Sequence, residues 1–155
     1  MKASKTPQAG TVTLRFDGAS RGNPGPSAAG VVVSAEDGAV LCRRGVRLAA
    51  GTNNVAEYKG LLFGLEECRR LGARRVEVRS DSELVVRQMR GEYRVRDPKL
   101  RSLYEKAREL ARAFDDVTFL AVSREDNAQA DGLCNLVFRK GRSLRDNIEE
   151  PDAVT

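Results

Sequence analysis

The fold is decided by residues 11–48, TVTLRFDGASRGNPGPSAAGVVVSAEDGAVLCRRGVRL. Residues 11–17 alternate strictly between apolar and polar side chains, which predicts a strand. A turn-rich segment then leads to two further apolar stretches, 28–36 and 39–48, and the dipeptide Asp37-Gly38 between them predicts a hairpin. The sequence therefore predicts a three-stranded antiparallel meander at the start of the fold.

The rest of the chain alternates between helices and strands. Leucines at helical spacing predict a helix that begins near Asn54, where Asn54 and Glu57 have the spacing of a capping box, and that ends at Gly72. The later elements are a strand at 74–80, a short helix at 82–90, a helix from Asp97-Pro98, a buried strand at 117–122 and a last helix from about Glu125. This order predicts an α/β fold with a five-stranded mixed sheet, in which parallel strands follow the meander and helices cover both faces.

Composition limits the kind of protein. Of the 155 residues, 41% are apolar and 32% charged, which fits one soluble globular domain without a membrane helix or a secretory signal. Cys42, Cys68 and Cys134 are far apart and the chain has no histidine, which excludes a disulfide framework, the common zinc sites and any triad with a histidine base. We expect a monomeric cytoplasmic protein without membrane contact.

The charge is unevenly spread. The chain carries a formal charge of +5, and arginines and lysines crowd residues 87–101, which is compatible with a polyanionic partner. Both ends of the chain lack apolar periodicity. We expect a flexible N-terminus at 1–10, one globular domain at 11–140 and a flexible charged tail at 141–155.

Four acidic residues are predicted to meet at one edge of the sheet. Asp17 and Asp81 follow strands that should be parallel neighbours, and open α/β sheets hold their sites at that edge. Glu57 lies in the first turn of the helix that the third strand delivers to the same edge. Asp131 lies in the last helix, which must pack back over the sheet. Each residue alone could simply be a turn, cap or surface residue.

Their convergence favours a metal site. Two carboxylates ~4 Å apart repel by about 4 kcal/mol at an effective dielectric near 20, so a cluster of them needs cations. Oxygen ligands suit hard divalent ions, Mg²⁺ with Mn²⁺ as a substitute. Two such ions could clamp the attacking and leaving oxygens of a phosphoryl transfer, which needs no histidine.

Four segments then carry a resemblance to a known family. They are FDGASRGNPGPSAAG (16–30), GTNNVAEYKGLLFGL (51–65), VRSDSELVVRQM (78–89) and REDNAQADGLCN (124–135). In this order they resemble the signature segments of type I ribonuclease H. The resemblance implies that residues 11–140 are a catalytic domain of this family and that its four metal-binding carboxylates are Asp17, Glu57, Asp81 and Asp131. It further implies cleavage of the RNA strand of an RNA–DNA hybrid, leaving 3′-hydroxyl and 5′-phosphate ends.

The resemblance also implies substrate contacts. Asn23, Asn53 and Asn54 match positions that reach the minor groove of the hybrid, where an amide can both donate to and accept from a 2′-hydroxyl. Thr52 resembles the hydroxyl of a pocket for a DNA-strand phosphate, and Gly22 fits a loop that approaches a ligand closely. The ordinary interpretation of all five residues is turn and cap formation.

The sequence also departs from the family. Many members carry a histidine in the loop before the last helix, whereas this chain has Arg124 in that region and is similar to a short, archaeal-like subgroup without the histidine. In that subgroup an arginine at this place is an active-site residue, so Arg124 is a candidate for holding the scissile phosphate or the product. The subgroup likeness suggests action on RNA–DNA junctions or double-stranded RNA as a further hypothesis.

Three alternatives stay open. A proofreading-type exonuclease on the same fold would have a glutamate two residues after the first aspartate, where this chain has Ala19. A non-catalytic RNA- or hybrid-binding module would usually have lost one of the carboxylates. The chain could also be a fragment of a larger protein.

Overall fold

The computed structural model describes residues 10–146 and the backbone of residues 148–149. The expected flexible N-terminus therefore lies outside the described residues, except for Gly10. Residues 147 and 150–155 of the expected tail lie outside them as well. Within the described part of the chain, no helix is both long enough and apolar enough to cross a membrane.

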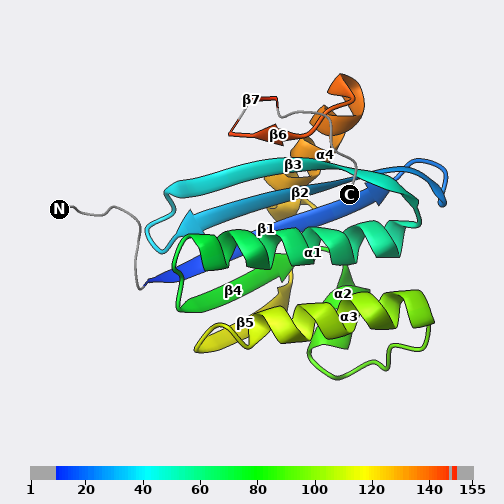
Figure 1. Ribbon diagram of the computed structural model, residues 1–155. Helices are drawn as coiled ribbons and strands as arrows, with labels where there is room; N and C mark the ends of the chain where they lie inside the picture. Colours follow the sequence, from blue (N-terminus) through cyan, green and yellow to red (C-terminus); the bar gives the residue numbers. More distant parts are fainter. Residues whose placement is uncertain (1–9, 147, 150–155) are drawn as a thin grey trace.

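The elements form one mixed sheet with helices on its two sides (Figure 1). The strands are β1 (Thr11–Ser20), β2 (Gly25–Ala35), β3 (Val40–Gly51), β4 (Arg75–Ser80), β5 (Asp116–Ala121) and the two-residue strands β6 (Leu144–Arg145) and β7 (Ile148–Glu149). The helices are α1 (Asn53–Arg70), α2 (Glu83–Met89), α3 (Pro98–Ala111), the 3₁₀ helix η1 (Glu125–Asn127) and α4 (Ala128–Lys140).

The predicted mixed sheet is confirmed. β1 pairs antiparallel with β2, and β2 pairs antiparallel with β3, so the meander forms as expected. β4 joins the other side of β1 in parallel, and β5 joins β4 in parallel. The strand order is β5-β4-β1-β2-β3-β6-β7, in which β6 and β7 extend the five predicted strands. This order puts the carboxyl ends of β1 and β4 side by side.

The two faces of the sheet are covered unequally. Figure 1 shows α1, α2 and α3 on one face and α4 on the other. Leu14 and Phe16 of β1 are fully buried in the core shared with α1, because alternate residues of a strand point to the same face. On the other face α4 packs on β2, β3 and β1. It comes so close that a Cβ atom at Gly30 would lie 2.1 Å from the carbonyl oxygen of Ala130.

The expectation that residues 117–122 form a buried strand is wrong in part. The strand is present as β5, but of its residues only Phe119 is buried, and Leu120 is 39% exposed. The reason is the strand order, which puts β5 at the edge of the sheet, where α4 does not cover it. A run of apolar residues alone does not distinguish an edge strand from a central one.

Part of the expected tail lies on the sheet. Leu144 is buried, and β6 pairs antiparallel with β3. The guanidinium of Arg145 donates two hydrogen bonds of 3.0 and 2.8 Å to the buried carboxylate of Glu67 in α1. The charged segment after residue 140 therefore begins as a part of the folded domain.

Candidate active site

The ends of β1 and β4 bring Asp17 and Asp81 to the same edge of the sheet. The last register pair between these strands is Arg15 with Arg79, and each aspartate follows two residues later on its own chain. Asp17 is only 6% exposed, whereas the side chain of Asp81 is 20% exposed. The predicted meeting of these two residues at one edge is present in the structure.

Glu57 reaches the same edge from α1, the helix that follows β3, as expected, but without the predicted capping box. The predicted capping box at Asn54 is wrong, because the N-cap of α1 is Thr52, two residues before Asn54, and the Thr52 hydroxyl accepts a hydrogen bond from the backbone N–H of Val55. Glu57 therefore does not fold back onto the start of its helix. Its Oε1 accepts a hydrogen bond of 2.9 Å from the backbone N–H of Gly18, one residue beyond Asp17.

Gly18 allows this contact between strand and helix. A Cβ atom at position 18 would lie 2.2 Å from the carbonyl carbon of Ala56 and 2.3 Å from the backbone nitrogen of Glu57. Only a residue without a side chain lets β1 approach the first turns of α1 this closely. The Asp-Gly pair in the sequence thus positions two carboxylates and is not simply a turn signal.

The carboxylates at this edge influence one another electrostatically. Burial, and then the charges of Asp81 and Asp131, raise the pKa of Asp17 to about 7. Burial, and then the charges of Asp17 and Asp81, raise the pKa of Glu57 well above its usual range. All four predicted acidic residues therefore take part in one cluster of repelling charges.

These side chains fit a hard divalent cation. They offer oxygen donors only, and burial together with the neighbouring carboxylates raises the pKa values of Asp17 and Glu57, which a bound cation would counteract. Among the residues that the structure describes, however, no three acidic or cysteine side chains are arranged to hold an ion as they stand. The edge is a set of neighbouring donors, and adjustment of side chains or further ligands would complete a coordination sphere.

Asn127 is a residue of this site that the sequence analysis did not single out. It is 1% exposed, and its Nδ2 donates hydrogen bonds of 2.8 Å to both the carbonyl oxygen of Phe16 and Oδ1 of Asp81. Its Oδ1 is buried and has no partner among the described residues. In the sequence, Asn127 and Asp131 form an Asn-x-x-x-Asp pattern, and this pattern could have pointed to Asn127. Asn135, one turn after Asp131, lies 3.5 Å from the carboxylate of Asp131.

The three predicted substrate asparagines lie beside the carboxylates and do not touch them. The Oδ1 of Asn23 accepts a hydrogen bond from the backbone N–H of Asn53, and the Oδ1 of Asn53 accepts one from the N–H of Ser20. These bonds of 2.9 and 3.0 Å tie the loop after β1 to the start of α1, where Asn54 follows as an exposed residue. Gly22, with a φ of 111°, makes the bend in that loop.

Arg124 lies at the rim of the cluster. Its Nε is 3.9 Å from Oδ2 of Asp81, and its side chain is 88% exposed. At this distance the pair is an ion pair without a hydrogen bond, and the exposed guanidinium is free to reach an incoming anion. The structure therefore places Arg124 next to the carboxylates, as expected, but does not fix it there.

Known proteins are similar to this chain in sequence and fold. The chain matches the reverse transcriptase-like family over residues 15–137. It is 44% identical over 126 residues to "Ribonuclease HI" of Halobacterium salinarum, which covers 81% of this chain and 63% of that protein. It is also 44% identical over 125 residues to "Bifunctional protein Rv2228c" of Mycobacterium tuberculosis, covering 80% of this chain and 34% of that protein. The chain thus spans less than two thirds of these relatives.

Solved structures agree with these relatives. The crystal structure of RNase H1 from Halobacterium salinarum superimposes with a TM-score of 0.83 at 42% identity, covering 84% of this chain and 99% of that one. LC11-RNase H1, solved in complex with an RNA/DNA hybrid, gives a TM-score of 0.80 at 38% identity, covering 84% of this chain and 98% of that one. The fold is thus that of a reverse transcriptase-like protein. Within that class, the chain belongs to the type I ribonuclease H family.

Proposed function

We propose that this chain is a divalent-metal-dependent endonuclease that hydrolyses the RNA strand of RNA–DNA hybrids and leaves 3′-hydroxyl and 5′-phosphate ends. The observation that carries the proposal is the cluster of Asp17, Glu57, Asp81 and Asp131 at one sheet edge, where burial and then the neighbouring carboxylates raise the pKa values of Asp17 and Glu57. The family to which the chain belongs, and the hybrid in the complex of LC11-RNase H1, support the choice of substrate.

The four carboxylates would hold the cation, Mg²⁺ or in its place Mn²⁺, and two ions would operate with substrate bound. When bound, the metal would supply Lewis-acid assistance to the hydrolysis of a phosphodiester bond. Asn127 would keep Asp81 turned toward the edge through its hydrogen bond of 2.8 Å. The backbone N–H of Gly18 would do the same for Glu57.

The asparagines would select the RNA strand. The Oδ1 atoms of Asn23 and Asn53 accept backbone hydrogen bonds, which leaves the two amide NH₂ groups without a partner among the described residues. Such groups can donate to a 2′-hydroxyl, the feature that distinguishes RNA from DNA. The exposed amide of Asn54 and the bend at Gly22 lie in the same region, and the Thr52 hydroxyl, although it caps α1, still has its own proton to donate to a phosphate.

Arg124 would act through the positive charge of its guanidinium group. Its guanidinium lies beside Asp81 at the rim, where it can bind the scissile phosphate or the leaving product by charge-assisted hydrogen bonds. This role would account for hydrolysis in a chain without histidine. Cleavage of RNA–DNA junctions or double-stranded RNA, a monomeric state and a cytoplasmic location stay predictions from the sequence.

The test is a cleavage assay with a hybrid of labelled RNA and unlabelled DNA in the presence of Mg²⁺, Mn²⁺ or EDTA. We expect internal cuts in the RNA strand only, lost in EDTA and reduced by at least ~10²-fold in Asp81→Asn. The matched control is Asp116→Asn, which changes an exposed aspartate at the start of β5. Binding of the hybrid without any cut would favour the non-catalytic module, and stepwise release of mononucleotides from an end would favour the exonuclease.

A further inference from the structure

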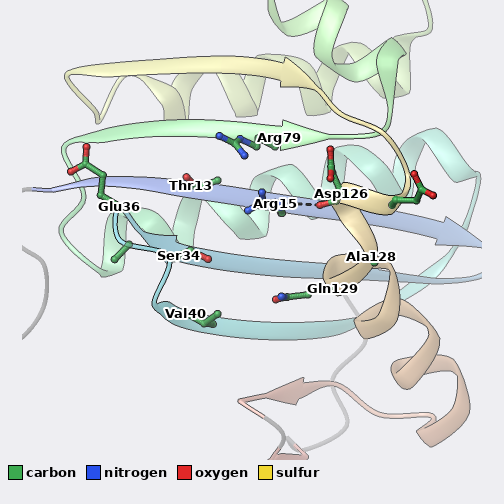
Figure 2. A pocket seen from close by; sticks show the side chains of 12 residues that line it. Thr13, Arg15, Ser34, Glu36, Val40, Arg79, Asp126, Ala128 and Gln129 are labelled. Atoms are coloured by element: carbon green, nitrogen blue, oxygen red, sulfur yellow. Dashed lines mark hydrogen bonds between the residues drawn. The ribbon is translucent and has the colours of Figure 1, made fainter.

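A groove outside the candidate active site lies on the same face of the sheet as α4, in the part that α4 does not cover. It has a volume of about 550 Å³, which is within the range of small-molecule sites. Its floor is formed by Thr13 and Arg15 of β1 and Arg79 of β4. Figure 2 shows these side chains in the groove, with Glu36 of the segment after β2 at one end and Asp126 of η1 at the other.

The floor holds two like charges directly opposite each other. Arg15 and Arg79 are register partners on neighbouring parallel strands, so their side chains leave the same face of the sheet from backbones ~4.8 Å apart. Like charges directly opposite each other on a sheet are destabilising. The carboxylate of Glu77, 2.9 Å from Nη2 of Arg79, offsets part of this repulsion, and an anion between the two guanidinium groups would offset the rest.

Both guanidinium groups have unused donors. Arg15 donates from Nε to the carbonyl oxygen of Asp126 at 3.1 Å, which leaves its two terminal nitrogens without a partner among the described residues. Arg79 donates from Nε and Nη2 to the carboxylate of Glu77, at 3.1 and 2.9 Å, which leaves Nη1. These bonds orient each guanidinium while terminal N–H groups remain available, and planar guanidinium groups suit phosphate oxygens.

The ends of the groove restrict the kind of anion. Glu36 lies at one end and Asp126 at the other (Figure 2), and Glu125 also lines the groove. A nucleic-acid strand running along the groove would bring its phosphates against these carboxylates. A small molecule with one phosphate in the middle would instead present hydroxyl or amino donors to the carboxylates at the ends.

From this arrangement we propose that the groove binds a small phosphate ester of the size and chemistry of a nucleoside monophosphate. The phosphate lies between Arg15 and Arg79, and the hydroxyl or amino groups of the remaining part donate to Glu36 or Asp126. This site is distinct from the edge of carboxylates, since none of the four carboxylates lines the groove, and it does not depend on the proposed nuclease function.

Calorimetric titration of the full chain with uridine 5′-monophosphate tests the proposal. EDTA is present so that no metal ion can bring a phosphate to the carboxylate edge. We expect binding that weakens about tenfold or more in Arg15→Gln and in Arg79→Gln, as loss of charge-assisted hydrogen bonds requires. Arg75→Gln is the matched control, since Arg75 is on the same face of β4 but outside the groove, and it should bind like the original chain.

Two further probes separate the ester from its parts. Inorganic phosphate should bind at least about tenfold more weakly than the nucleotide, and uridine should give no measurable heat. Equal affinity in the original chain and Arg79→Gln, equal weakening in Arg75→Gln, or equally tight binding of inorganic phosphate would each overturn the proposal. Thermal unfolding of each variant shows whether it is folded. If Arg79→Gln is unstable, Arg79→Lys, which keeps the charge and loses the planar fork, serves in its place and should still bind several-fold more weakly.

Discussion

At the scale of single residues, Asn127 connects the chemistry of the site to its scaffold. Its two hydrogen bonds join β1, the segment after β4 and the start of α4 through one buried amide. Because one of the bonds goes to Asp81, the orientation of that carboxylate depends on a residue 46 positions away in the sequence. We infer that Asn127 is a positioning residue for the proposed metal site.

Replacement by alanine tests this role. Asn127→Ala removes both bonds and should lower kcat for hybrid cleavage by about tenfold or more, with KM little changed, because Asn127 is only 1% exposed and so is out of reach of a substrate. It should also lower the free energy of unfolding by about 1–3 kcal/mol, the usual cost of leaving a buried polar group unpaired. Steady-state kinetics and urea unfolding measure the two effects. Gln129→Ala, at an exposed residue of α4, is the control, and an unchanged kcat in Asn127→Ala would reject the role.

The positions of some site residues could be predicted from the sequence, and those of others could not. Asp17 and Asp81 could be placed at one edge because local alternation defines the strands and the hairpin fixes their directions. The bonds of Asn127 could not be predicted, since the partner oxygen in β1 is 111 positions away. The start of α1 was misassigned by two residues at the cap because both Thr52 and Asn54 are good N-cap residues, and only tertiary packing decides between them.

At the scale of secondary structure elements, Glu67 joins three parts of the fold. Its buried carboxylate accepts hydrogen bonds from Arg44 of β3, Arg70 of α1 and Arg145 of β6. Burial alone would raise the pKa of Glu67, but the hydrogen bonds and charges of Arg145 and Arg70 outweigh it and hold the pKa at about 2. The segment after α4 is therefore attached to the domain by a charged side chain that the periodicity of the sequence does not reveal.

The lowered pKa makes a pH prediction. Since the folded state favours the ionised form, the contribution of Glu67 to stability is fully present above about pH 4.5 and is lost as the pH falls toward 2. We expect Glu67→Gln to be less stable than the original chain by up to about 3 kcal/mol at pH 7, with a smaller difference at pH 3.5. Urea unfolding at the two pH values gives this difference. Glu105→Gln, in an exposed ion pair with Arg101, should have little effect at either pH.

A constant destabilisation by Glu67→Gln at both pH values would show that the carboxylate contributes through its shape and not through its charge. The attachment of β6 would then rest on the packing of Leu144, which is buried, and on the pairing of β6 with β3. A larger difference at pH 3.5 than at pH 7 would contradict the direction of the pKa shift.

At the scale of the whole molecule, acidic and basic side chains gather in different places around the site. The carboxylates occupy the edge at β1 and β4, whereas the connection between α2 and α3, residues 90–97, carries exposed arginines at 90, 94 and 96. Tyr93 in the same connection is 49% exposed. A substrate with two strands of phosphates could thus meet the acidic edge through bound cations and the basic connection directly.

Salt dependence tests the role of this connection. If Arg94 and Arg96 each contact one phosphate, the double variant Arg94→Gln/Arg96→Gln should bind the hybrid more weakly and reduce the slope of log affinity against log salt concentration by about 2. Fluorescence anisotropy with a labelled hybrid at several salt concentrations gives the slope. The control is Arg112→Gln with Arg74→Gln, two exposed arginines away from the connection. An unchanged slope in the first variant would mean that the hybrid does not reach residues 90–97.

The central claim is that acidic side chains from separate elements bind divalent cations together at one edge of the sheet. Its most direct test is a titration of the chain with Mn²⁺ in the absence of nucleic acid, in which electron paramagnetic resonance measures the concentration of free Mn²⁺ at each step. We expect Asp17→Asn to weaken Mn²⁺ binding by at least about tenfold, since Asp17 lies at the centre of the repelling charges, while Asp116→Asn binds like the original chain. Mn²⁺ binding that is equally tight with and without the Asp17 carboxylate would contradict the account.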